Sequence, residues 1–307
     1  MSPRQCDEAA QPLGGVGMSD WVIGVIGGSG LYDIEALANK RSLLIETPWG
    51  QPSDQLLEGT LGGVRVIFLP RHGRGHRVGP TDVNYRANIA ALKIAGCTDI
   101  VSVSAVGSLR IDMPPRTFVM VDQYIDRTFA RHKTFFEPGV VGHVSMADPT
   151  CARLSGLLAA AARQSGATVV QGGVYVVMEG PQFSTRAESR LYRSWGCDVI
   201  GMTNMPEAKL AREAELPYAS VAMVTDFDCW HHEEKPVEVE HVLQCMHDNV
   251  LHARAMIEHL VRALPARRES SPIDRALDGA IITSAAARDP KVLDKLRCLS
   301  KRPSVFG

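Results

Sequence analysis

The 307-residue sequence has no excess of charge of either sign: 33 Lys and Arg stand against 34 Asp and Glu, a formal net charge of −1. Nucleic-acid-binding domains usually carry a basic excess, so the balance argues against nucleic acid as a partner. No apolar run approaches the ~20 residues that span a bilayer, and residues 1–20 lack the apolar core of a signal peptide. We therefore expect no membrane partner and a flexible leader over residues 1–20.

Paired cysteines are also missing. The 7 cysteines are an odd number, widely spaced and without a C-x-x-C pair, which argues against a disulfide framework or a cysteine-rich zinc site. Reduced thiols predict a cytoplasmic protein. The remaining composition, 45% hydrophobic and 22% charged, is ordinary for a globular protein with a buried core.

Short apolar segments alternate with helical patterns along the chain. Strands apolar on both faces are typical of a sheet covered by helices on both sides, so we expect one α/β domain over residues 21–264 and a partly helical C-terminal appendage over 265–307. The expected helices are Thr81–Ala95, Pro149–Gln164, Arg186–Ser194 and Pro236–Leu264. The expected strands are Trp21–Ile26, Val64–Leu69, Ile100–Ser104, Phe118–Val121, Val174–Met178, Val199–Met202 and Tyr218–Thr225.

A glycine-rich turn follows the first strand, in GVIGGSG over residues 24–30. Its glycines let the backbone approach an anion, and Ser29 offers a hydroxyl. The segment fits neither the G-x-G-x-x-G nor the Walker A pattern, and a tight turn without a ligand remains the alternative. After the next strand, LPRHGRGH (69–76) offers Arg71 for a bidentate grip on phosphate and His72 as a further donor. A solvated basic loop is the alternative there.

Two more strand ends carry hydroxyls. Ser102–Ser108, with Ser104, leaves a strand toward a glycine turn, and Met202–Asn204, with Thr203, follows another strand. Ligands of open α/β sheets bind at the carboxyl ends of strands. Four such ends with hydroxyls, backbone N–H groups and a guanidinium together predict one phosphate site.

Asp226 and Asp228 follow the last strand in VTDFDCW. If the strand continues, both carboxylates point to one side, where one can act as an acid and the other as a hydrogen-bond acceptor. A polar exit from the strand is the alternative. A metal site among residues 226–234 is a weaker one, because adjacent residues do not readily converge on one ion and no H-x-x-x-H spacing is present.

The segment MEGPQFSTR (178–186) contains Phe183, whose ring can stack on a heterocycle. Phe183 can equally serve as an apolar staple at the start of the following helix, with Ser184 or Thr185 as its cap.

Together these segments resemble the 5′-methylthioadenosine phosphorylases of the purine nucleoside phosphorylase family. The resemblance covers about residues 22–264 and is carried by IGGSGLYD, LPRHGRGH, VNYRANI, SVSAVGSLR, DQYIDRT, MEGPQFSTRAES, VIGMTNMPEAKLAREA and AMVTDFDCW. It implies a central mixed, mostly parallel sheet flanked by helices, a homotrimer with active sites near subunit interfaces, no cofactor and no metal.

The resemblance also implies roles for individual residues. Phosphate would lie against Ser29, Arg71, His72, Ser104, Ala105 and Thr203. The nucleoside would contact Met202 and His76 at the ribose, and Phe183, Ser184, Asp226 and Asp228 at the base. Its 5′-alkylthio group would meet Val239, Val242 and Leu243, together with His143 of a neighbouring subunit. Many relatives carry Thr where this chain has Ser29 and Ser104, an exchange that keeps the hydroxyl.

The chemistry expected is attack of phosphate on C1′ with inversion while the purine leaves, with Asp226 as the acid at N7 and Asp228 accepting from the 6-amino group. The reference pKa of an Asp is about 3.9, so burial and Asp228 must raise that of Asp226. Inorganic phosphate is then a co-substrate. The alternatives are a 6-oxopurine nucleoside or methylthioinosine phosphorylase, a hydrolytic nucleosidase, a metal hydrolase, and a non-catalytic nucleoside-binding protein.

Overall fold

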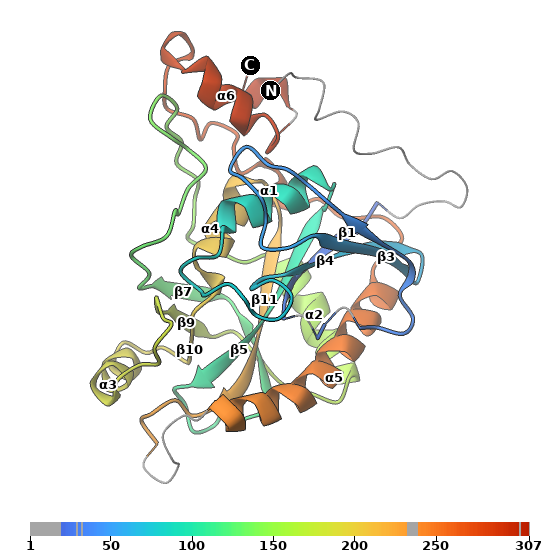
Figure 1. Ribbon diagram of the computed structural model, residues 1–307, viewed down its shortest axis with the longest axis vertical. Helices are drawn as coiled ribbons and strands as arrows, with labels where there is room; N and C mark the ends of the chain where they lie inside the picture. Colours follow the sequence, from blue (N-terminus) through green and yellow to red (C-terminus); the bar gives the residue numbers. More distant parts are fainter. Residues whose placement is uncertain (1–19, 29, 32, 232–238, 301, 307) are drawn as a thin grey trace.

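The computed structural model describes residues 20–28, 30, 31, 33–231, 239–300 and 302–306, with the backbone alone for 239–244. Strands and helices alternate along the chain (Figure 1). The strands are β1 Val22–Gly27, β2 Ala38–Leu43, β3 Leu56–Leu61, β4 Val64–Pro70, β5 Asp99–Ser108, β6 Thr117–Val121, β7 Gln123–Asp126, β8 Thr168–Gln171, β9 Val174–Val177, β10 Val199–Gly201 and β11 Tyr218–Asp226. The helices are α1 Tyr85–Ile94, α2 Ala152–Gln164, α3 Arg186–Ser194, α4 Asn204–Glu213, α5 Val239–Ala263, α6 Pro290–Leu296 and α7 Pro303–Phe306.

These strands form one mixed sheet in the order β2-β3-β4-β1-β5-β10-β9-β7, from which β11, β6 and β8 branch at β5. The pairings of β1 with β4 and β5, of β11 with β5, of β6 with β8, and of β9 with β7 and β10 are parallel. The others are antiparallel. The expected mixed, mostly parallel sheet flanked by helices is confirmed.

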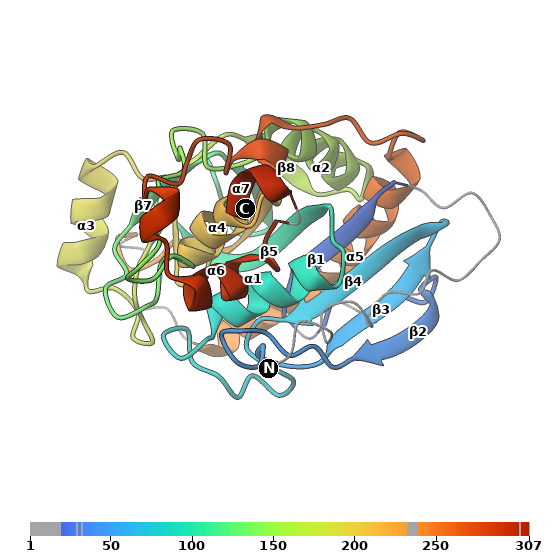
Figure 2. The ribbon, with the colours of Figure 1, turned by 90° about the horizontal axis from the view of Figure 1, so that it is seen from above.

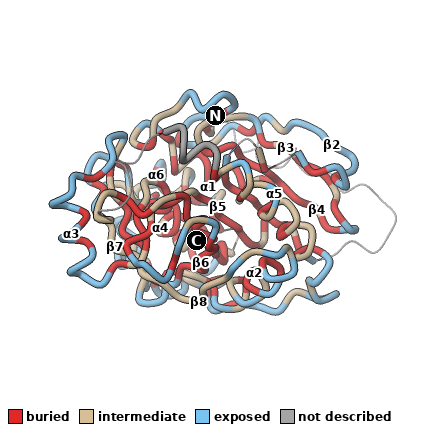
Figure 3. Tube along the Cα trace, turned by 90° about the horizontal axis from the view of Figure 1, so that it is seen from below, coloured by how far each residue is buried: buried red, intermediate tan, exposed pale blue. Residues whose placement is uncertain are grey.

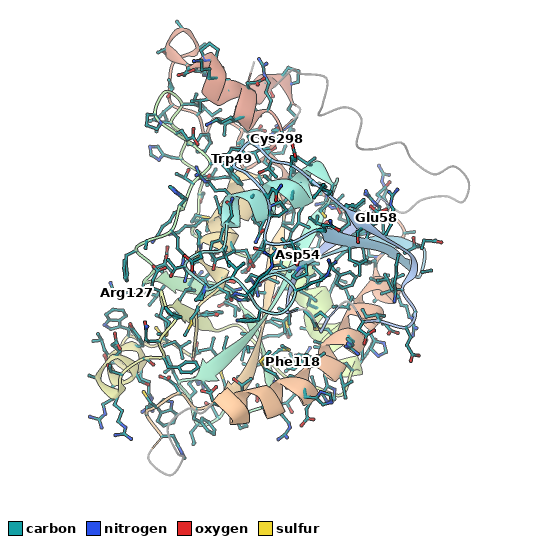
Figure 4. The ribbon with its side chains drawn as sticks, viewed as in Figure 1. Trp49, Asp54, Glu58, Phe118, Arg127 and Cys298 are labelled. Atoms are coloured by element: carbon teal, nitrogen blue, oxygen red, sulfur yellow. The ribbon has the colours of Figure 1, made fainter. Side chains whose placement is uncertain are left out.

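Two apolar layers cover the sheet. Ile23 and Val25 of β1 point to the layer of α2 and α5, whereas Ile26 points to the layer of α1 and α4, as strand alternation requires. Figure 2 shows α1 and α4 on one side of the strands and α2 and α5 on the other, and Figure 3 shows the buried strands at the centre of the molecule. Phe118 of β6 faces α5, where its ring meets that of His252 edge to face (Figure 4).

The sequence located most of the expected helices and strands correctly, but their first and last residues differ from the structure. α1 begins at Tyr85 rather than Thr81, because Asn84 accepts a hydrogen bond from Ala87 N and caps it. α2 begins after Cys151, and α5 ends at Ala263. Four strands (β2, β3, β7 and β8) and helix α4 were missed; β2 is almost wholly exposed, so it shows no apolar pattern.

The C-terminal residues pack against the domain rather than trailing from it. Ile281 bridges to Gly142, and His143 N donates to Ala280 O at 2.9 Å. Leu296 and Phe306 join the apolar layer of α1 and α4, and Cys298 lies at the same end of the molecule as Trp49 (Figure 4). The boundary near residue 264 stays a prediction.

Candidate active site

The candidate site lies along one edge of β5, a central strand of the sheet that is labelled in Figure 1. On that edge β1 pairs as far as Ser102, and β10 pairs from Gly107, while β11 fills the opposite edge through Gly107. Residues 103–106 between them pair with no described strand on the first edge. Val103 O, which faces this edge, accepts from Arg71 Nη1 at 3.1 Å, and the N–H of Ala105, two residues on, faces the same edge. We call residues 103–106 the open edge.

This geometry corrects the expected arrangement of strand ends. β5 runs through Ser108, so Ser104 and Ala105 lie inside the strand and not in a glycine turn. β10 is antiparallel to β5, so Met202 and Thr203 approach from the opposite direction to the ends of β1 and β4. The segments still meet, because β1 and β10 leave the open edge between them.

Two buried hydroxyls lie at this edge. Ser104 Oγ and Thr203 Oγ1 have no partner of normal hydrogen-bond geometry among the described residues. Both lie close to the buried hydroxyl of Tyr175, whose pKa is raised by burial and lowered in part by these two groups. A Cβ on Gly201 would come within 2.1 Å of that tyrosine oxygen, so only glycine fits there. Buried polar groups normally have partners, so Ser104 and Thr203 are suited to hold an anion.

Arg71 is more deeply engaged than the sequence suggested. Its Nε donates to Glu207 Oε2 at 2.9 Å and its Nη2 to Glu207 Oε1 at 3.1 Å, in a fully buried pair. Nη2 also donates to Ser102 Oγ, and Nη1 to Val103 O at 3.1 Å. The bidentate partner of this guanidinium is therefore a carboxylate of the protein. The phosphate role of Arg71 stays a prediction, and it would use the remaining Nη1 proton.

His72 and His76 stack, with ring centroids 4.4 Å apart. Burial and the charge of Arg71 lower the pKa of His72 to about 4, so its ring is neutral at pH 7. Its Nδ1 lies 2.9 Å from Val78 O and must donate there. Nε2 then carries a lone pair and can only accept a hydrogen bond in this neutral form, and the phosphate role of His72 stays a prediction.

Asp226 and Asp228 lie together, although not by strand alternation. β11 ends at Asp226 after a register shift, and Asp228 has a left-handed φ of +51°. Asp228 N donates to Asp226 Oδ1 at 2.8 Å, and Thr225 Oγ1 to Asp226 Oδ2 at 2.7 Å. Gly107 makes room for the pair, since a Cβ there would lie 2.9 Å from Asp226 Oδ1 and 3.2 Å from Asp228 Cβ.

Asp228 is buried and held by serine hydroxyls. Ser184 Oγ lies 2.8 Å from its Oδ1 and 2.9 Å from its Oδ2. Burial raises the pKa of Asp228, and the hydroxyls of Ser189 and Ser184 offset part of the rise. Phe183, one residue before Ser184, is 49% exposed, so its ring has a free face. Helix α3 is capped by Thr185 with Glu188 in a capping box, so the staple position directly before the cap is held by Ser184 and not by Phe183.

Of the other residues expected at the site, some lie near it, one lies elsewhere and several are outside the described part of the chain. Met202 contacts the 178–184 segment, because a Cβ on Gly180 would lie 2.5 Å from its Sδ. His143 lies elsewhere, on an exposed segment that borders a cavity of about 560 Å³ with Lys133, Lys209 and Glu213. Ser29 and the side chains of Val239, Val242 and Leu243 lie outside the described residues.

Metal ligation finds no support in the described part of the chain, where no group of three or more His, Cys, Asp or Glu side chains could hold an ion. Positions 232–234 of the cluster considered above lie outside that part. Among the described helices, none is both long and apolar enough to cross a membrane.

Several residues that support the site lie in the motifs named above but have no role that the sequence predicts. Glu207 lies in VIGMTNMPEAKLAREA and holds Arg71. Glu179 lies in MEGPQFSTRAES and receives Arg131 at 2.9 Å. The sequence carried no specific signal for either residue, because both motifs contain other charged residues and burial does not show in the residue pattern.

Comparison with known proteins matches residues 22–262 to the phosphorylase superfamily. An S-methyl-5′-thioadenosine phosphorylase of Cereibacter sphaeroides is 58% identical over 92% of this chain and 98% of its own length. A solved methylthioadenosine phosphorylase from an antarctic soil metagenomic library superposes with a TM-score of 0.87 at 48% identity, covering 92% of this chain and 99% of that one. The enzyme of Schistosoma mansoni in complex with adenine gives a TM-score of 0.75 at 41% identity, over 79% and 91% of the two chains.

Proposed function

The chain belongs to the phosphorylase superfamily, among its S-methyl-5′-thioadenosine phosphorylases, and on this basis we propose that it cleaves 5′-methylthioadenosine with inorganic phosphate. The products are adenine and 5-methylthioribose 1-phosphate, a step of purine and methionine salvage. The enzyme is then a pentosyltransferase.

One observation carries the proposal. The hydroxyls of Ser104 and Thr203, which have no partner of normal hydrogen-bond geometry among the described residues, lie at the open edge of β5. The Asp226–Asp228 pair lies at Gly107 of the same strand. An anion site close to a pair of carboxylates fits a reaction in which phosphate attacks the sugar of a nucleoside and the purine leaves.

Phosphate would occupy the open edge, with the hydroxyls of Ser104 and Thr203 and the N–H of Ala105 as its donors. Arg71 donates to Val103 O at this edge while Glu207 holds its guanidinium in place, and the remaining Nη1 proton would be a further donor to phosphate. Phosphate bound under the sugar stabilises the positive charge that develops at C1′ and then attacks it with inversion.

The base would lie between Phe183 and the Asp pair. Asp226 is the proposed acid at N7, and Asp228 the acceptor for the 6-amino group. Met202 would face the ribose with His76, and Val239, Val242 and Leu243 the alkylthio group.

A second substrate class is favoured by one feature. The raised pKa of Asp228 makes its neutral form more accessible, and a neutral carboxyl can donate to a 6-oxo group. Methylthioinosine and 6-oxopurine nucleosides are therefore the alternative substrates.

The deciding assay measures adenine release from methylthioadenosine and hypoxanthine release from methylthioinosine, each with and without phosphate. We expect phosphate-dependent adenine release to be the faster reaction. Faster hypoxanthine release would reverse the substrate assignment, and undiminished cleavage without phosphate would indicate a hydrolytic nucleosidase. Nucleoside binding without any product would indicate a binding protein.

The proposal extends to assembly and location. A homotrimer in the cytoplasm, with His143 of one subunit reaching the site of its neighbour, fits the exposed position of that histidine. Light scattering gives the mass of the assembly directly, and a monomeric active enzyme would exclude the role of His143 in a neighbouring site.

A further inference from the structure

Arg131 lies outside every residue assigned to the substrates, yet its side chain is only 1% exposed. Its Nε donates to Glu179 Oε1 at 2.9 Å, and its Nη2 to Glu179 O at 2.6 Å. Its Nη1 donates to Met202 O at 2.7 Å and Met205 O at 2.6 Å, and to Tyr85 Oη at 3.0 Å. One guanidinium therefore joins the segment before Phe183 to the turn that carries Thr203.

The backbone leaves these carbonyls available to Arg131. Met205 interrupts helix α4 with φ −117° and ψ 132°, so its carbonyl does not follow the helical pattern. At Gly180, where φ is +71°, the other segment passes close to Met202, because a Cβ on Gly180 would lie 2.5 Å from Met202 Sδ. The two segments are thus in contact at Gly180 and are joined by the hydrogen bonds of Arg131.

Glu179 fixes the other end of this connection. Besides Arg131, its carboxylate accepts from Phe129 N at 2.5 Å, from Ala130 N at 3.0 Å and from Thr81 Oγ1 at 2.7 Å. Burial opposes the charge of Glu179, but these bonds outweigh it and lower its pKa to about 2. The pair is charged at every working pH, and its hydrogen bonds are of the strong, charge-assisted kind.

We propose that Arg131 is a positioning residue for the nucleoside site, which holds the base-binding segment 178–184 and the Met202–Thr203 turn at a fixed separation. This inference rests on the proposed function, because it is the assignment of Ser184, Met202 and Thr203 that makes the two segments walls of one site. Lysine cannot replace Arg131, since a point charge with three donors does not reach the acceptors that the planar fork reaches.

The test compares Arg131→Lys with Arg268→Lys. Arg268 is a matched control, because it is also poorly exposed and donates to Asp99, to both oxygens of Asp274 and to Thr98 O. Asp99 is the first residue of β5, at the end away from the open edge. Each variant replaces a planar guanidinium by an ammonium group among poorly exposed hydrogen-bond partners. Only the partners of Arg131 include residues assigned to the site.

We measure kcat, and KM for methylthioadenosine and for phosphate, at a temperature well below each variant's Tm. Arg131→Lys is expected to lower kcat about 10²-fold and to raise both KM values, because misplacement by about 1 Å can cost that much. Arg268→Lys is expected to keep kcat/KM within about twofold of wild type, since it leaves both walls in place.

A folded Arg131→Lys enzyme with wild-type kcat/KM overturns the inference, and so does an equal loss in both variants. If Arg131→Lys does not fold, Glu179→Gln decides: a folded variant with reduced kcat and raised KM supports the inference, and wild-type kinetics overturn it. Failure of the proposed function is separate, because it shows as a wild-type enzyme that releases no adenine with phosphate.

Discussion

The hydroxyl of Ser184 lies within hydrogen-bond distance of both carboxylate oxygens of Asp228, 2.8 Å from Oδ1 and 2.9 Å from Oδ2. A serine hydroxyl both donates and accepts, so it can serve Asp228 in either protonation state. It donates to the ionised carboxylate and accepts from the neutral one. The contact therefore fixes where the carboxyl lies in either state, and it favours the ionised form.

Asp228→Asn should change the preferred base. The amide retains the size of the carboxyl and a bond to Ser184, but it can turn an N–H toward a 6-oxo group. We expect kcat/KM for methylthioadenosine to fall by on the order of 10²-fold relative to methylthioinosine. The ratio of adenine to hypoxanthine released from an equimolar mixture measures the change, and an unaltered ratio would exclude Asp228 from base selection.

Gly107→Ala should impair catalysis without unfolding the protein. The added methyl would lie 2.9 Å from Asp226 Oδ1, so the carboxylate must turn and break its bond with Asp228 N. We expect kcat to fall by roughly 10²-fold. Gly156→Ala in α2 is the control: no atom lies within 4 Å of its new methyl, so activity should persist and stability rise by about 0.5–1 kcal/mol. Equal kcat in both variants would contradict the geometry.

Ser104→Ala should separate ligand binding from stability. Its hydroxyl has no partner of normal geometry among the described residues, so its loss should change the free energy of unfolding by less than about 0.5 kcal/mol, while KM for phosphate rises about 10-fold. Ser102, two residues earlier, donates to Glu207 and accepts from Arg71. Ser102→Ala should therefore cost about 1–3 kcal/mol in chemical denaturation. A stability loss at Ser104 equal to that at Ser102 would remove the evidence for an anion there.

The sequence predicted the α/β fold and the segments of the site, because apolar strands and glycine turns are local signals. It could not predict that β10 runs antiparallel to β5, since strand direction depends on pairings made far apart in the chain. The partner of Arg71 could not be predicted either, because Glu207 lies 136 residues away in the chain. The tautomer of His72 depends on Val78 O and on burial, neither of which shows in the residue pattern.

Glu213 should make stability depend on pH. It is buried on α4 and accepts from Phe135 N at 2.7 Å and Thr134 Oγ1 at 2.8 Å, yet burial raises its pKa to about 7. The folded chain then holds a proton that the unfolded chain releases near the reference pKa of about 4.3. The stability of the folded form is thus fully present below that pH and declines as the pH rises to about 7.

Glu213→Gln isolates this contribution, because the amide resembles the protonated carboxyl and Thr134 can accept from its N–H. At pH 4 the two proteins should have similar free energies of unfolding, since the wild-type side chain is then largely neutral in both the folded and the unfolded chain. At pH 8 the variant should be the more stable by up to on the order of 3 kcal/mol. Urea denaturation at both pH values gives the difference, and a variant less stable at pH 8 would show that the buried carboxylate has a compensating cation.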